Sequence, residues 1–83
     1  MHRATSKFWV RLAALPDSVQ SLAHRNFDLL KQDPRHPSLH FKKVGRFWSA
    51  RVGLDHRALA IEDGPDFVWV WIGSHDDYNR LIQ

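Results

Sequence analysis

The stretch "FWSARVGLDHRALAIEDGPDFVWVWIG", Phe47–Gly73, decides the fold. It contains three runs rich in β-branched and aromatic residues, and a fourth run precedes them. The four runs are Leu39–Gly45, Phe47–Gly53, His56–Glu62 and Phe67–Gly73. Such runs are typical of strands, and the links "GR", "LD" and "DGPD" are short enough for hairpins. The stretch therefore predicts a four-stranded antiparallel meander.

Helical periodicity replaces alternation in the N-terminal part of the chain. Thr5 or Ser6 can cap a short helix that continues through Lys7–Ala14. Pro16 suits the first position of a second helix, which we expect to end near Gln32. Helices and strands that are segregated along the chain predict an α+β fold, here an N-terminal helical hairpin packed on the sheet. At this length we expect one domain over residues 1–83.

Alternation also assigns side chains to the two faces of the sheet, although a slip of one residue would invert the assignment. We expect the helices to contact Trp48, Ala50, Val52, Val68, Val70 and Ile72, and the outer face to carry Ser49, Arg51, Trp69 and Trp71. An arginine beside two tryptophans can hold a phosphate and stack a base. Aromatic pairs on a sheet are also common in cores and in partner interfaces.

Charge is divided unevenly along the chain. Residues 1–57 hold eleven Lys/Arg against four Asp/Glu, a net +7, whereas residues 58–83 hold one Arg against five acids, a net −4. A basic surface with aromatic residues favours a polyanion such as RNA, with Lys42, Lys43 and Arg46 as candidate phosphate contacts. The alternative is a solubilising surface.

Several classes of protein are excluded or disfavoured. The sequence has no cysteine, so disulfides and thiolate metal sites are excluded and a cytoplasmic location is compatible with the composition. No apolar run is long enough to span a bilayer, and we expect a soluble, unprocessed protein without membrane contact. Although His36, His40, His56 and His75 raise the question of a metal, no HExxH motif is present and Pro37 keeps His36 and His40 off a shared helical face. We expect neither a metal nor another cofactor.

The closing motif "IGSHDDYNRLI", Ile72–Ile82, has two interpretations. Ser74 can cap a short C-terminal helix, with Asp77 at the capping-box position. Alternatively, His75 and Tyr78 form a catalytic corner, in which histidine suits proton transfer near neutral pH. A residue at a helix start can serve both purposes, so the two interpretations remain open.

Three segments in this order, "DPRHPSLHFKKV", "FWSARVGLDHRALA" and "WVWIGSHDDYNRLI", resemble the RelE/ParE superfamily of toxins from type II toxin–antitoxin systems. The resemblance covers nearly the whole chain from Leu15. It implies a RelE/ParE-like fold and a cognate antitoxin as partner. One departure concerns the short first strand of the family: only "MHRAT" precedes the first helix, so we expect the sheet to lose an edge strand or keep a reduced one.

The resemblance also implies a site. In the RelE branch a basic residue on a central strand and a His or Tyr near the C-terminus carry much of the chemistry, and the matching positions here are Arg51, Arg57, His75 and Tyr78. We assign Arg51 to transition-state charge, His75 to general acid or base catalysis and Tyr78 to orientation or stacking. The expected RNA contacts are Lys42, Lys43, Arg46, Arg57, Trp69 and Trp71.

The fold serves more than one activity. Members of the RelE branch are mRNA interferases, endoribonucleases that cleave messenger on the ribosome and so inhibit translation, whereas members of the ParE branch poison DNA gyrase. Gyrase poisons commonly lack the C-terminal His/Tyr pair, so "HDDY" favours the nuclease. A gyrase poison and an inactive, antitoxin-binding member remain the alternatives.

Overall fold

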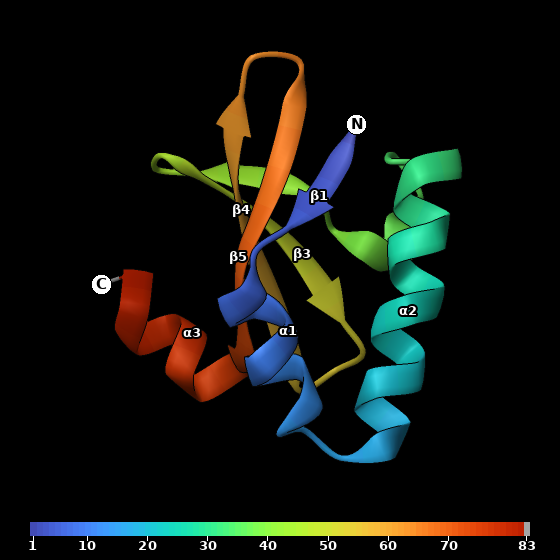
Figure 1. Ribbon diagram of the computed structural model, residues 1–83, viewed down its shortest axis with the longest axis vertical. Coiled ribbons are helices and arrows are strands. Elements are labelled where there is room, and N and C mark those ends of the chain that lie inside the picture. The colour runs from blue at the N-terminus through green and yellow to red at the C-terminus, as the bar shows by residue number, and fades with distance from the viewer. Residues whose placement is uncertain (83) are drawn as a thin grey trace.

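The computed structural model describes residues 1–82 and shows a twisted sheet with one helix in front of it, a second to its right and a third at its lower left (Figure 1). The strand order is β1-β5-β4-β3-β2. The elements are β1 His2–Ala4, α1 Ser6–Ala13, α2 Asp17–Gln32, the 3-10 helix η1 Pro37–Leu39, β2 Lys42–Val44, β3 Phe47–Val52, β4 His56–Asp63, β5 Asp66–Ser74 and α3 His75–Ile82.

The helices begin and end where local chemistry dictates. The Thr5 hydroxyl accepts a hydrogen bond from the backbone N–H of Phe8 at 3.2 Å, which satisfies one of the unpaired donors of the first turn of α1. The second helix follows Pro16, carries Asp17 in its first turn and stops at Gln32. Both predicted helices are confirmed, as are the four predicted strands, although β2 is shorter than its run.

The first strand, expected to be missing or reduced, is present in reduced form. It has three residues and pairs in parallel with β5, with Arg3 opposite Val68. The expectation of a four-stranded, fully antiparallel sheet was therefore wrong. Three residues are too few to show alternation, and the strand is held by bonds to distant residues: Phe67 N–H donates to the Met1 carbonyl at 2.8 Å and Arg3 pairs with Asp63 at 2.7 Å.

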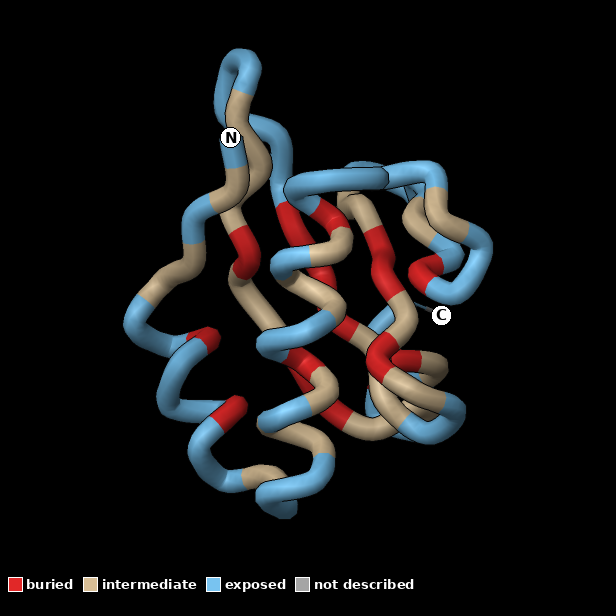
Figure 2. Tube along the Cα trace, turned by 90° about the vertical axis from the view of Figure 1, so that its right-hand side faces the viewer, coloured by how far each residue is buried: buried red, intermediate tan, exposed pale blue. Residues whose placement is uncertain are grey.

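The hydrophobic core lies between the sheet and the inner sides of α1 and α2, where the buried positions of the trace concentrate (Figure 2). Its buried members are Phe8, Leu12, Ala23, Leu30, Leu39, Ala50, Val52, Ala58, Ala60, Trp69 and Ile72. The helix-facing side predicted for β3 is confirmed, since Ala50 and Val52 belong to this core and Trp48 packs against it.

The face predicted for Trp69 was wrong. Its side chain is 2% exposed and lies in the core, not on the outer face. The cause is an irregularity in the β4–β5 register: Leu59 pairs with Trp71 and Ala60 with Trp69, which leaves Val70 as an extra residue. Because this bulge shifts the alternation by one, Trp69 and Ile72 face the same side although they are three residues apart.

His2 fixes β1 to this aromatic part of the core. Its ring stacks on Phe67 with centroids 5.2 Å apart, and its Nδ1 accepts a hydrogen bond from the Trp69 indole N–H at 3.1 Å. An acceptor nitrogen must be unprotonated. Burial lowers the pKa of His2 below its ordinary value of 6.5, and the N-terminal ammonium and Lys31 lower it further.

The first prediction concerns the pH dependence of stability. Because the pKa of His2 is lower in the folded than in the unfolded chain, its contribution is fully present above about pH 6.5 and is lost as the pH falls towards the folded-state pKa. We expect His2→Asn, whose amide oxygen can replace Nδ1 without titrating, to flatten this part of the profile. Urea unfolding of both proteins between pH 5 and pH 8 measures the difference, and parallel profiles would contradict the role of His2.

Candidate anion-binding and catalytic site

Two arginines lie directly opposite each other on neighbouring strands. The β3–β4 register pairs Arg51 with Arg57, and side chains of a directly opposed pair point to the same face. Their neighbours Ala50 and Ala58 belong to the core under the helices. Arg51 and Arg57 therefore occupy the opposite face of the sheet, as the sequence predicted for Arg51.

Neither guanidinium has a counter-charge within residues 1–82, where the ion pairs involve other side chains. Arg51 Nε and Arg57 Nη1 are buried and have no hydrogen-bond partner among these residues. Burial, and then the charge of Arg51, lower the pKa of Arg57. Buried guanidinium donors without acceptors are suited to an anion, and guanidinium binds phosphate with paired hydrogen bonds.

Arg51 forms no ion pair with Asp55 or Glu62 within residues 1–82. Glu62 instead accepts the indole N–H of Trp48 and forms an ion pair with Lys43 at 3.7 Å. The backbone carbonyl of Asp55 accepts from the N–H of His75 at 2.7 Å.

The lysines at Lys42 and Lys43 divide between the faces, as expected. Lys42 pairs with Ser49 and so shares the face of Arg51, whereas Lys43 pairs with Trp48 on the other side. Arg46 lies in the β2–β3 turn with its guanidinium 5.4 Å from the Phe47 ring centre. Phe47 is four residues before Arg51, about 13 Å along the strand, so only Lys42 lies near the arginine pair.

The closing motif places α3 next to Arg57. The Ser74 hydroxyl accepts from the N–H of Asp77 at 3.1 Å, which confirms the predicted helix cap. Tyr78 is buried, and the Arg57 guanidinium lies 5.8 Å from its ring centre. The His75 ring lies 6.3 Å from that of Tyr78, and its Nδ1 is 3.2 Å from the side-chain amide of Asn79. The helix start thus brings Tyr78 to Arg57, with His75 next to Tyr78.

The acidic residues of α3 do not oppose an anion with full effect. Asp77 forms an ion pair with Arg80, and its hydrogen bonds from Arg80 and then Ser74 lower the pKa of its carboxyl.

Neither of the two tryptophans expected to stack bases has both faces of its ring free. Trp69 is buried and cannot contact RNA without unfolding of the core. Trp71 lies on the outer face, as predicted, but the guanidinium of Arg11 from α1 lies 5.1 Å from its ring centre and Arg11 Nε donates to the Ile72 carbonyl at 2.9 Å. One side of the Trp71 ring is therefore already covered.

His40 is the residue that the sequence did not assign to the site. It follows η1 with a left-handed backbone, φ 45°, and its side chain is exposed. Arg51 lowers the pKa of His40 most, followed by burial, Arg57 and Lys42. Strand alternation could not have indicated it, because His40 lies before β2 with a left-handed backbone, and from the sequence it was considered only as a metal ligand.

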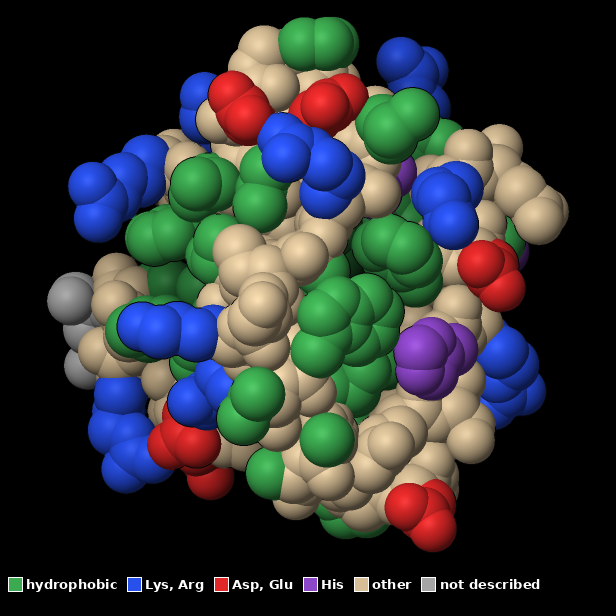
Figure 3. Space-filling view, viewed as in Figure 1, with side chains coloured by type: hydrophobic (Ala, Val, Ile, Leu, Met, Phe, Trp, Pro, Cys, Tyr) green, Lys and Arg blue, Asp and Glu red, His purple; other side chains and the backbone are tan. Residues whose placement is uncertain are grey.

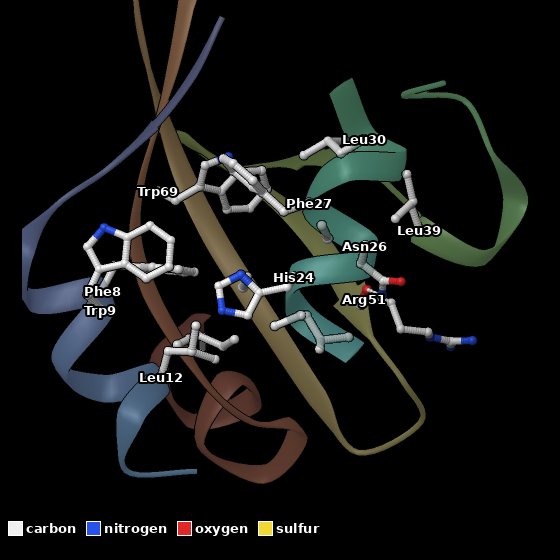
Figure 4. Close-up of a pocket in the computed structure, with 15 residues that line it drawn as sticks. Phe8, Trp9, Leu12, His24, Asn26, Phe27, Leu30, Leu39, Arg51 and Trp69 are labelled. Atoms are coloured by element: carbon white, nitrogen blue, oxygen red, sulfur yellow. Dashed lines mark hydrogen bonds between the residues drawn. The ribbon is translucent and has the colours of Figure 1, made fainter. Parts of the chain in front are cut away.

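A cavity of about 40 Å³ lies elsewhere, between α1, α2 and the sheet. Figure 4 shows Phe8, Trp9 and Leu12 on one side of it and His24 and Phe27 on the other, while the Arg51 side chain extends away. Its lining is mostly apolar, and the sheet behind it carries Ala50 and Ala58. This space is a packing void under the helices and not the anion site.

The described part of the chain contains no group of three or more His, Asp or Glu side chains arranged to hold a metal ion. No helix within residues 1–82 has the length and apolarity needed to cross a membrane.

The fold is shared with RelE toxins over nearly the whole chain. RelE in the RelB–RelE antitoxin–toxin complex from Methanococcus jannaschii is 12% identical and has a TM-score of 0.75, with 98% of this chain and 99% of that chain covered. The archaeal RelE–RelB complex from Pyrococcus horikoshii OT3 matches with 17% identity and a TM-score of 0.65, and 88% of this chain and 91% of that chain are covered. The isolated E. coli RelE toxin matches with 8% identity and a TM-score of 0.65, and 99% of this chain and 94% of that chain are covered. No curated protein matches the sequence.

The family follows from the sequence. The model of the ParE-like toxin domain matches residues 17–80, and the chain belongs to this family. The resemblance to RelE/ParE superfamily toxins is thereby confirmed.

The second prediction separates the helix cap from His75. Ser74→Ala should lower the free energy of unfolding by about 1 kcal/mol, because the N–H of Asp77 loses its acceptor. His75→Ala should stay within about 0.5 kcal/mol of the parent, because its side chain is only partly buried and its ring neighbours, Tyr78 and Asn79, belong to the same helix. Ser21→Ala, an exposed position within α2, is the control for serine removal. Urea unfolding that gave equal losses at Ser74 and Ser21 would show that the cap contributes nothing.

Proposed function

We propose that the protein is the toxin of a toxin–antitoxin pair and acts as an endoribonuclease that cleaves messenger RNA on the ribosome. The observation that carries this proposal is the directly opposed pair Arg51 and Arg57, which has no counter-charge within residues 1–82 and adjoins Tyr78, whose ring lies next to that of His75. Like charges placed directly opposite each other destabilise a sheet. A ligand with negative charge at this position accounts for such an arrangement.

Cleavage of RNA needs the groups that this site offers. A base must remove the proton of a ribose 2′-hydroxyl, cations must stabilise the charge that develops on the phosphate oxygens, and an acid must protonate the leaving 5′-oxygen. Arg51 and Arg57 supply the cations, and His75 supplies proton transfer. Tyr78, packed beside Arg57, holds the guanidinium and borders the position of the substrate.

One further basic residue extends the phosphate contacts along the sheet. Lys42 lies on the same face as the arginines, whereas Lys43 lies on the other face and Arg46 lies in the β2–β3 turn, away from the pair. Each neutralised phosphate releases counterions, so RNA affinity should fall steeply with salt.

The third prediction concerns Arg51. Arg51→Ala should lower ribosome-dependent cleavage by about 10²–10³, the effect of losing one transition-state donor. It should leave stability unchanged or slightly increased, because it removes repulsion from Arg57 and a buried donor without a partner. Arg46→Ala, in an exposed turn, is the control and should retain most activity.

Primer extension on ribosome-bound messenger and urea unfolding measure the two effects. A large loss of stability with the loss of cleavage would make Arg51 a structural residue, and full cleavage by Arg51→Ala would remove it from the chemistry.

One observation favours the second candidate, a gyrase poison without nuclease activity. The family that matches is the ParE-like toxin domain, and the resemblance assigns gyrase as the target of the ParE branch. Under this alternative the arginine pair binds DNA or an acidic protein surface, and gyrase supercoiling is inhibited while ribosome-bound messenger remains intact.

The proposal includes an antitoxin partner. The similar RelE chains of M. jannaschii and P. horikoshii are described in complexes with RelB. In this chain Lys and Arg side chains surround centrally placed apolar side chains on the face that carries α1 (Figure 3), and Trp9 and Val10 of α1 are exposed. A partner that covers basic and apolar surface should carry Asp or Glu beside apolar residues.

The fourth prediction concerns the docking surface on the outer face of the sheet. Trp71 and Arg51 remain candidates there, whereas Trp69 does not because it is buried. Trp71→Ala combined with Arg51→Glu should weaken antitoxin binding in isothermal titration calorimetry at least tenfold. Unchanged affinity would place the antitoxin elsewhere, with the exposed surface of α1 as the next region to test.

A further inference from the structure

We propose that Arg11 binds a phosphate of single-stranded RNA next to the phosphate held by Arg51 and Arg57; this inference rests on the proposed ribonuclease function. Arg11 belongs to α1, which packs against β5 on the side of the sheet that the helices cover. Its guanidinium nevertheless reaches the outer face, because the neighbouring strand β1 is short. The basic site is thereby extended from the centre of the sheet to its edge.

The edge of β5 is open where Arg11 crosses it. β1 ends at Ala4, which pairs with Trp69, so the following residues of β5 have no strand on that side. Arg11 Nε donates to the Ile72 carbonyl at 2.9 Å, and the guanidinium carbon lies 5.1 Å from the Trp71 ring centre. Figure 1 shows α1 beside this lower part of β5, near the start of α3. The side chain is therefore held at two points as it passes round the edge.

Gly73 shows where the guanidinium ends. A methyl group at Gly73 would place its carbon 3.2 Å from Arg11 Nη2 and 2.6 Å from the Trp71 ring. The β4–β5 register pairs Gly73 with Arg57, and directly opposed residues face the same side. The space left by the missing side chain thus lies on the outer face, where Trp71 and Arg11 fill it. Arg11 Nη2 lies one strand beyond Arg57, and Arg51, Arg57 and Arg11 follow one line across β3, β4 and β5.

The Nη groups of Arg11 have no acceptor within residues 1–82. The side-chain hydrogen bond that Arg11 makes there uses Nε, and the ion pairs there involve other side chains. Asp77 of α3 is bonded to Arg80 and Ser74, which lower the pKa of its carboxyl, and Arg11 adds a smaller effect in the same direction. Arg11 is therefore close enough to α3 to act on its charges, yet keeps its Nη donors for a ligand.

Three guanidinium groups in a line suit a chain of phosphates better than a single anion. Neighbouring strands are about 4.8 Å apart, so the line from β3 to β5 extends over about 10 Å. Each guanidinium can bind a phosphate with paired hydrogen bonds. The contact with Trp71 fixes Arg11 before RNA arrives, which lowers the entropy cost of binding. Because Arg11 lies beyond the arginine pair, it positions the RNA strand and does not act on the bond that breaks.

The first experiment measures binding without cleavage, with single-stranded RNA whose 2′-O-methyl groups replace the attacking hydroxyls. Fluorescence anisotropy at several salt concentrations gives the slope of the logarithm of affinity against the logarithm of salt concentration. Arg11→Gln should reduce this slope by about 0.7, the contribution of one phosphate contact to a single strand. Arg25→Gln removes the same charge from an exposed position of α2 and should leave the slope unchanged. Arg11→Lys keeps the charge and should keep the slope.

The second experiment needs no variant and so does not depend on the folding of Arg11→Gln. The Nε–H of Arg11, bonded to the Ile72 carbonyl, gives a side-chain signal that NMR can follow in the parent protein. Addition of the 2′-O-methyl RNA should shift this signal, because the bound phosphate changes the environment of the whole guanidinium. The Nε–H signal of Arg25 is the control and should stay in place.

The outcomes separate this inference from the proposed function. An equal slope for the parent and Arg11→Gln, or an equal fall for Arg11→Gln and Arg25→Gln, would overturn the inference, as would an Arg11 signal that does not move. Cleavage of ribosome-bound messenger by the parent would keep the proposed function in each of these cases. A parent that cleaves no messenger would overturn the proposed function whatever the slope.

Discussion

The extra residue at Val70 in β5 determines which side chains of this strand enter the core and where the strand ends. β5 is hydrogen-bonded to β1 and β4 and packs against α1. With the bulge, Trp69 and Ile72 both enter the core while Trp71 faces the other side. The register after the bulge then pairs Gly73 with Arg57, so that the strand ends and α3 begins beside the arginine pair. A regular β5 would turn either Trp69 or Ile72 away from the core, a loss of about 1.5–3 kcal/mol for a large side chain.

The arginine site depends on that core, because the site itself contains an arrangement of charges that lowers stability. Two like charges oppose each other on β3 and β4, and each arginine has a buried nitrogen without a partner within residues 1–82. Both effects cost stability. Directly behind them Ala50 and Ala58 anchor the strands in the core, so the backbone holds the guanidinium groups together despite their repulsion. Perturbed charges held by a rigid scaffold are typical of functional sites.

Much of this could be predicted from the sequence, because helix caps, strand runs and short turns are local signals. Arg51, Arg57, His75 and Tyr78 were identified as site candidates, and the structure brings Arg51, Arg57 and Tyr78 together with His75 adjacent. The parallel pairing of β1 with β5 and the bulge could not be predicted, since both depend on pairing between distant residues. Trp69 was assigned to the wrong face for that reason. His40 could not be placed from the sequence, because it lies outside the strands with a left-handed backbone, where alternation does not apply.

The same hydrogen bonds at the start of α3 bear on both interpretations of the closing motif, the helix cap and the catalytic corner. The N–H of His75 donates to the Asp55 carbonyl at 2.7 Å, which ties the first residue of α3 to the turn between β3 and β4. That turn connects the strands that carry Arg51 and Arg57. Ser74 then caps the helix and sets the direction in which Tyr78 returns to Arg57. Because the helix start is bonded to the turn that joins the strands of Arg51 and Arg57, the same local structure that begins α3 also fixes the position of His75 relative to these strands.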